Sequence, residues 1–65
     1  MKILLEDIMV NKNLSIRQVS ILTGIPKSTI DDIASGRKSP RMDVMEKLAQ
    51  GLKVRISDLY DSPYK

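Results

Sequence analysis

The stretch from Leu14 to Gly36 constrains the fold of this 65-residue chain more than any other feature. Its sequence, LSIRQVSILTGIPKSTIDDIASG, contains two short amphipathic segments separated by a glycine. Ser15, followed three residues later by Gln18, forms a capping box that opens a helix. Gly24 suits the left-handed backbone conformation that ends a helix, and Gly36 ends the second segment in the same way. The pattern predicts two short helices joined by a tight turn.

The two predicted helices span about residues 16–23 and 26–35. Pro26 suits the first turn of the second helix, because its missing N–H has no partner to lose there. Each helix has an inward face of apolar or small side chains at helical spacing. These faces consist of Ile16, Val19, Ser20 and Thr23 in the first helix and of Ile30 and Ile33 in the second.

Three further segments continue the helical pattern. Residues 2–11 place their apolar side chains on one face, residues 42–53 carry a clean apolar stripe, and residues 56–60 form a last turn. Gly51 costs roughly 1 kcal/mol of helix propensity relative to alanine, which indicates close packing against another backbone. There is no strand alternation and no internal repeat. The predicted fold class is all-α, a compact domain of five helices.

Size and composition exclude several classes of protein. Because the chain has only 65 residues, we expect one domain over residues 1–65, with a flexible tail at 61–65. A chain this short buries only about 60% of its unfolded surface, so its stability is marginal. The chain has neither cysteine nor histidine, which excludes disulfides and the usual zinc ligands. No apolar run approaches the ~20 residues of a membrane span. Glu6 and Asp7 argue against a signal peptide, and the lack of cysteine fits the cytoplasm.

The composition also gives no basis for catalysis. No pair of carboxylates is obviously held in an apolar cleft, and the chain lacks a glycine-rich phosphate loop. We therefore expect no enzymatic activity, no cofactor and no metal site.

Basic residues gather just after the second helix of the central pair. The chain carries 11 basic and 8 acidic residues, a net charge of +3. Three of the cations lie within residues 37–41. They can complement the negative end of the helix dipole, worth about 0.3–1 kcal/mol. They can also neutralise the phosphates of a nucleic acid, and the two roles are compatible.

These features together resemble the lambda-repressor-like, Cro/C1-type (Xre family) helix-turn-helix domain. The likeness spans roughly residues 3–60. It is carried by Leu14-Ser15, Val19-Ser20, Gly24-Ile25, Ser28-Thr29-Ile30, Ile33, Gly36, Pro40, Leu48-Ala49, Leu52, Val54 and Leu59. The resemblance implies a sequence-specific double-stranded DNA-binding transcriptional regulator of the repressor type. Such a protein contacts the major groove with the helix at 26–35. Because one small module contacts only about 3–5 base pairs well, we expect it to bind as a homodimer.

The resemblance also assigns residues to the DNA. Lys27, Ser28 and Asp32 match positions where the family contacts base edges, with Asp31 as a further candidate. Lysine can donate to guanine O6 and N7, and aspartate can accept from cytosine N4. Lys27, four residues before Asp31, could offset part of the repulsion between the carboxylates and DNA. The alternative is that both aspartates are solvated helix residues.

Two further groups complete the expected interfaces. Ser35, Arg37 and Lys38 match the positions where the family binds backbone phosphates, and Arg41 belongs to the same basic loop. By family analogy, the dimer contact involves Arg41, Ser57, Leu59 and Tyr60. The chain departs from the family pattern at Ile16, where glutamine usually contacts a phosphate. It also departs at Ser20 and Ala34, where alanine and often glutamate are found.

Ile21 and Leu22 replace residues that are commonly polar in the family. We expect them to pack against the first helix or the C-terminal turn. The alternative is an exposed apolar patch that binds another protein. That alternative, together with the acidic residues of the helix at 26–35, motivates a second function, a protein-interaction module of the same fold, such as the antitoxin of a toxin–antitoxin pair. A third option, a fragment of a longer regulator, gains little support from the tail DSPYK.

Overall fold

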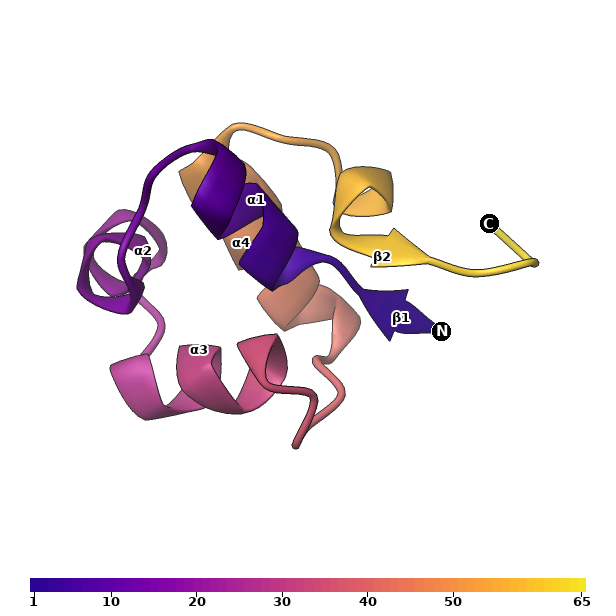
Figure 1. The fold of residues 1–65 in the computed structure, drawn as a ribbon, viewed down its shortest axis with the longest axis horizontal. Coiled ribbons are helices and arrows are strands. Elements are labelled where there is room, and N and C mark those ends of the chain that lie inside the picture. Colours follow the sequence, from indigo (N-terminus) through magenta and orange to yellow (C-terminus); the bar gives the residue numbers. More distant parts are fainter.

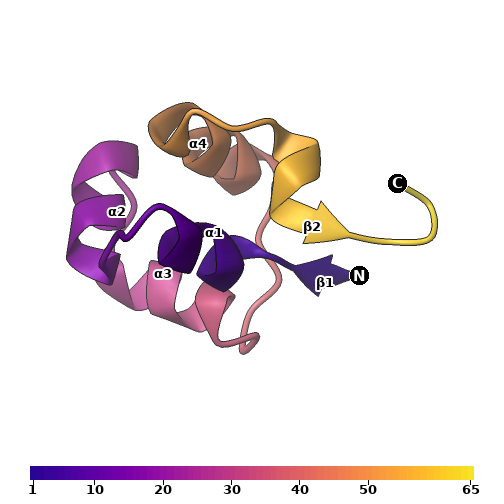
Figure 2. The ribbon, with the colours of Figure 1, turned by 45° about the horizontal axis from the view of Figure 1, so that its top comes forward.

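The computed structural model describes all 65 residues and contains four α-helices, a short 3₁₀ turn and a two-stranded ribbon. The elements are, in chain order, β1 (Lys2–Ile3), α1 (Leu5–Asn11), α2 (Ile16–Thr23), α3 (Lys27–Ala34), α4 (Met42–Leu52), η1 (Ile56–Leu59) and β2 (Tyr60–Asp61). In Figure 1, α2 lies at one end of the molecule and the ribbon at the other, with α3 along the lower edge. The view in Figure 2 shows α1 and α4 on opposite sides of the interior. None of the helices has the length and apolar character needed to cross a membrane.

The helix boundaries follow the predicted caps closely. The Oγ of Ser15 accepts from the Gln18 N–H at 3.1 Å, and the Gln18 Oε1 accepts from the Ser15 N–H at 2.8 Å, which confirms the capping box. Gly24 and Gly36 have φ angles of 74° and 83°, so both adopt the predicted left-handed conformation. Pro26 is extended and precedes α3, so the predicted helical start at Pro26 is one residue early.

The prediction of five helices is wrong at both ends of the chain. Lys2 and Ile3, expected in the first helix, form β1 and pair antiparallel with Asp61 and Tyr60. The Leu4 N–H extends this pairing by donating to the Leu59 carbonyl at 2.8 Å. The fifth predicted helix is reduced to η1, a single 3₁₀ turn. The two ends of the chain satisfy each other's backbone groups here, and helical periodicity carries no information about that pairing.

The core contains 11 buried residues, all apolar, drawn from every helix. They are Leu5, Met9, Val19, Ile25, Ile30, Ile33, Met45, Leu48, Ala49, Leu52 and Leu59. No side-chain polar atom is buried without a hydrogen-bond partner. The predicted inward faces of the two central helices and the apolar stripe of α4 are therefore confirmed.

Two hydroxyl groups fix the turn between α2 and α3. The Ser20 Oγ donates to the Ile25 carbonyl at 2.6 Å. The Thr23 Oγ1 donates to the Val19 carbonyl at 2.7 Å and accepts from the Ile25 N–H at 3.3 Å. Serine at position 20, where the family usually has alanine, thus supplies a hydrogen bond that alanine cannot make. The bonds to Ile25 link the end of α2 to the turn that leads into α3.

Gly51 lies where α4 packs closely on the end of α2. A Cβ added to Gly51 would lie 2.6 Å from the Thr23 Cγ2 and 2.7 Å from the Leu22 carbonyl oxygen. The carbonyl belongs to helix backbone and cannot move aside freely. The predicted close packing at Gly51 is therefore confirmed, and it explains a glycine inside a helix.

We expect Gly51→Ala to lower the free energy of unfolding by about 1–3 kcal/mol, because the overpacking outweighs the gain in helix propensity. Urea denaturation measures the effect. Gln50→Ala changes an exposed neighbour in the same helix and should alter stability by no more than about 0.5 kcal/mol. A Gly51→Ala protein as stable as the parent would show that α2 and α4 do not approach this closely.

Candidate nucleic-acid interface

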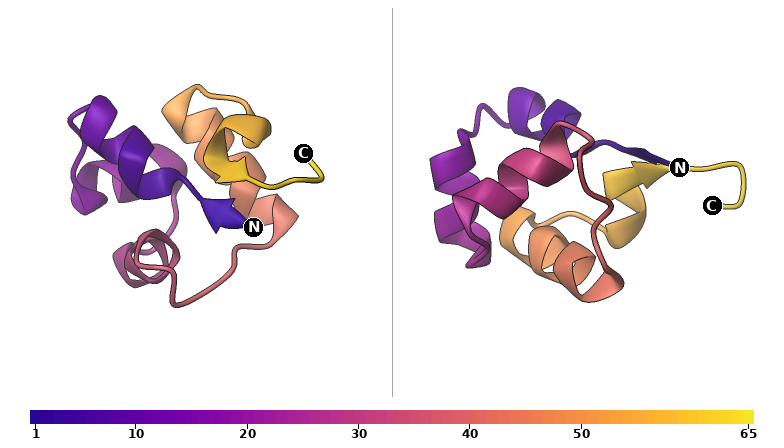
Figure 3. Two further views of the ribbon diagram at one scale, coloured as in Figure 1. Left: turned by 45° about the vertical axis from the view of Figure 1, so that its right-hand side comes forward. Right: turned by 90° about the horizontal axis from the view of Figure 1, so that it is seen from below.

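Helix α3 turns one side into the core and leaves the other uncovered. Ile30 and Ile33 are buried, whereas Lys27, Ser28 and Asp31 are exposed. Figure 1 shows α3 along the edge of the molecule, and the right-hand view of Figure 3 shows it in front of the other helices. The polar side of α3 is therefore accessible to a large ligand.

The carboxylates of α3 pair with the cations that follow the helix. The Arg37 Nη2 lies 2.6 Å from the Asp31 Oδ2, and the Arg37 Nε donates to the Asp32 Oδ1 at 3.0 Å. The Lys38 Nζ lies 3.7 Å from the Asp32 Oδ2. The left-handed turn at Gly36 brings these cations back to the last turn of α3.

These ion pairs lie at the surface. They alter the distribution of charge on α3 more than they stabilise the fold. The Arg37 side chain is 58% exposed and that of Asp31 is 54% exposed, so solvent screens their attraction. The hydrogen bonds that Arg37 donates to Asp32 and Asp31 raise the pKa of Arg37 above its ordinary value. Like any arginine in a protein, Arg37 is positively charged at neutral pH.

The expected pairing of Lys27 with Asp31 does not form. The cation beside Asp31 is Arg37, six residues later, and Lys27 stays exposed without an ion pair. The guanidinium reaches both aspartates at once from the turn after the helix, which a lysine on the helix itself cannot do.

The remaining phosphate candidates lie along the same stretch of chain. Ser35 is exposed at the end of α3, where its Oγ donates to the Asp32 carbonyl at 3.3 Å. Lys38 is exposed in the loop that follows. Arg41 is also exposed, directly before α4, and forms no ion pair.

The residues expected at a dimer contact differ in accessibility. Arg41 is exposed, while Ser57 and Tyr60 are half-buried. Leu59 is completely buried in the core of its own subunit. It therefore offers no surface to a second copy and instead supports η1 from inside.

The expectation that Ile21 and Leu22 pack against the rest of the subunit is wrong. Ile21 is 74% exposed and Leu22 is 51% exposed. Together with Leu14 and Gln18 they line a shallow groove, which we call the α2 patch. An eight-residue helix has only one inward face, and Val19, Ser20 and Thr23 occupy it in α2.

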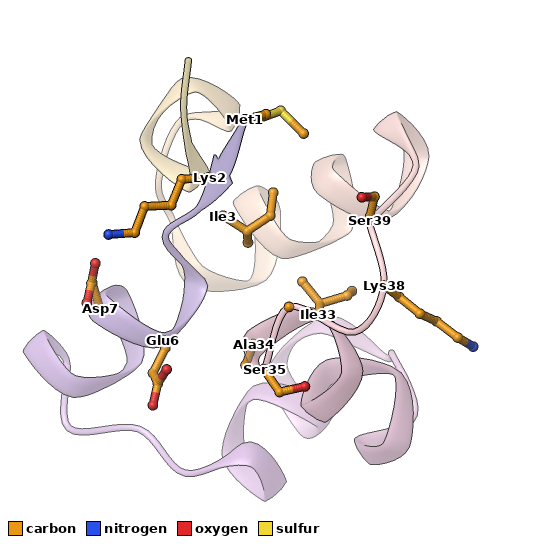
Figure 4. Close-up of a pocket in the computed structure, with 11 residues that line it drawn as sticks. Met1, Lys2, Ile3, Glu6, Asp7, Ile33, Ala34, Ser35, Lys38 and Ser39 are labelled. Carbon is orange, nitrogen blue, oxygen red and sulfur yellow. The ribbon is translucent and has the colours of Figure 1, made fainter.

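The largest hollow lies between the N-terminal segment and the end of α3 (Figure 4). It has a volume of about 480 Å³. Its charged lining has both signs, with Lys2, Glu6 and Asp7 on one side and Lys38 on the other. Lys38 points away from the hollow. Because the hollow is open and its charges are mixed, we assign it no ligand.

A sequence model of the Cro/C1-type HTH DNA-binding domain family matches residues 5–63. The chain belongs to this family, and its helix-turn-helix consists of α2 and α3. The predicted family is therefore confirmed. No curated protein and no solved structure matches the chain significantly.

The exposure of the α2 patch predicts how truncations will affect stability. We expect Leu22→Ala to lower the free energy of unfolding by no more than about 1 kcal/mol, because half of the residue is exposed. Leu48→Ala is the matched control: the same truncation at a fully buried position should cost about 2–5 kcal/mol. Thermal or urea unfolding distinguishes the two. Equal losses would place Leu22 in the core.

Proposed function

We propose that this protein is a sequence-specific double-stranded DNA-binding transcriptional regulator that acts as a cytoplasmic repressor. The observation that carries the proposal is the uncovered polar side of α3 in a domain of the Cro/C1 type. Helix α3 enters the major groove, and its buried isoleucines hold the polar side outward. A bound regulator of this kind represses by occupying DNA that the transcription machinery needs.

In this proposal, the first turn and the middle of α3 contact the bases. Lys27 and Ser28 are exposed at the start of the helix, where recognition helices contact base edges. Asp32 accepts from a cytosine amino group, and Asp31 lies beside it. The phosphate contacts come from Ser35, Arg37, Lys38 and Arg41, which follow one another along the end of α3 and the next loop.

We propose that the protein binds as a homodimer, with Arg41, Ser57 and Tyr60 near the contact and Leu59 supporting it from the core. One module of this size specifies only a few base pairs, so two copies about one helical turn apart give useful specificity. Selection of duplexes from a random pool tests binding, preferred bases and two-fold symmetry in one experiment. Failure to enrich any duplex would overturn the proposed function.

The base contacts predict a change of preference rather than a general loss. Replacing Lys27 with alanine or Asp32 with asparagine should alter discrimination at one base-pair position by about 1–3 kcal/mol. Competition binding on single-position variants of the selected duplex measures this. Lys47→Ala, an exposed change on α4, is the control and should preserve every preference. A uniform loss across all sequences would remove the altered residue from the base-contacting group.

The phosphate contacts predict a change in salt dependence. Replacing Lys38 and Arg41 together with alanine should weaken binding to all duplexes alike. Because each phosphate contact contributes about 0.9 to the slope of log affinity against log salt, the slope should fall by about two. Lys12→Ala/Lys47→Ala removes the same charge elsewhere and should change the slope less. An unchanged slope in the first variant would contradict the phosphate assignment.

A second candidate function is supported by the α2 patch. Ile21 and Leu22 expose apolar side chains on α2, whereas the proposed DNA contacts lie on α3 and the loop after it. This fits a protein-interaction module, such as an antitoxin, that binds an apolar surface of a partner protein. A protein that enriches no duplex but forms a complex with a partner encoded beside it, lost in Ile21→Ser/Leu22→Ser, would favour this function.

A further inference from the structure

The Arg37 guanidinium spans both carboxylates on the proposed DNA-contacting side of α3. We propose that Arg37 promotes DNA binding mainly by neutralising Asp31 and Asp32, and that its contact with a phosphate is secondary. Arg37 is then a positioning residue that lets an acidic helix approach a polyanion. This inference rests on the proposed function, because it concerns how α3 approaches DNA.

One edge of the Arg37 guanidinium is hydrogen-bonded within the protein itself. The Nε donates to Asp32 at 3.0 Å and the Nη2 donates to Asp31 at 2.6 Å. These two N–H groups lie on the same side of the planar group and form the fork that arginine uses for bidentate contacts with carboxylate or phosphate. In the free protein, this fork is already occupied.

The two aspartates depend on Arg37 to different degrees. Arg37 is the one cation within 4.0 Å of Asp31, whereas Asp32 also has Lys38 at 3.7 Å. Lys27, the remaining cation of α3, pairs with neither. Loss of Arg37 therefore leaves Asp31 as an uncompensated charge on the side of α3 that faces the phosphates, and like charges at close range oppose association.

A direct phosphate contact and a neutralising role give different results in a double-mutant cycle. The cycle combines Arg37→Ala with the paired change Asp31→Asn/Asp32→Asn and measures affinity and salt slope on a duplex of unselected sequence. Such a duplex removes the contribution of base preference, so only charge effects remain. Asparagine keeps the size of aspartate and removes its charge.

If Arg37 neutralises the aspartates, Arg37→Ala should weaken binding roughly tenfold in the parent chain and less than about twofold in the Asp31→Asn/Asp32→Asn background. If Arg37 mainly holds a phosphate, the loss should be the same in both backgrounds, with a slope lower by about 0.9 in each. That second result would overturn the inference. Arg41→Ala is the matched control and should cost the same factor in both backgrounds.

A conservative variant gives an independent test. Arg37→Lys keeps the charge, but an ammonium group cannot span two carboxylates as the planar fork does. We expect it to recover only part of the lost affinity in the parent chain, and full recovery would overturn the inference. Because Arg37 is exposed, thermal unfolding should confirm that all variants fold. If the parent chain binds no duplex, the proposed function fails and the inference with it, whereas binding with equal losses overturns the inference alone.

Discussion

The close packing of α2 against its two neighbours is the constraint on which the rest of the structure depends. Gly51 lets α4 approach the end of α2, and the hydroxyl groups of Ser20 and Thr23 satisfy the backbone of the following turn. Larger or purely apolar side chains there would separate the helices or leave polar groups unpaired. Since α3 leaves this turn directly, the same contacts determine how its polar side faces outward.

The charge arrangement on α3 is unusual for a surface expected to meet phosphates. Two aspartates lie on it, and the cations that compensate them come from the turn after the helix rather than from the helix. The left-handed conformation of Gly36 is what returns the chain far enough for Arg37 to reach both carboxylates. The backbone conformation at Gly36 thus contributes to the arrangement of charges on the exposed side of α3.

The protein presents two different exposed surfaces. The side of α3 is polar and charged, and the α2 patch is apolar. A small domain with a limited core leaves some apolar side chains exposed. Ile21 and Leu22, however, are neighbours on one short helix, so they form a patch and not two scattered exposed residues. The two surfaces are built from the two helices of one helix-turn-helix, so a partner bound at the patch would lie close to α3, the helix proposed to contact DNA.

Local patterns in the sequence determined the parts of the fold that depend on nearby residues. The Ser15–Gln18 capping box, the left-handed glycines at 24 and 36, the apolar spacing of α2, α3 and α4 and the family itself all follow from them. The base, phosphate and dimer contacts stay predictions. Only the tertiary structure decided that residues 2–3 pair with 60–61, that Ile21 and Leu22 face solvent, and that Arg37 binds both aspartates. These features depend on where separate segments meet in space, and helical periodicity describes one segment at a time.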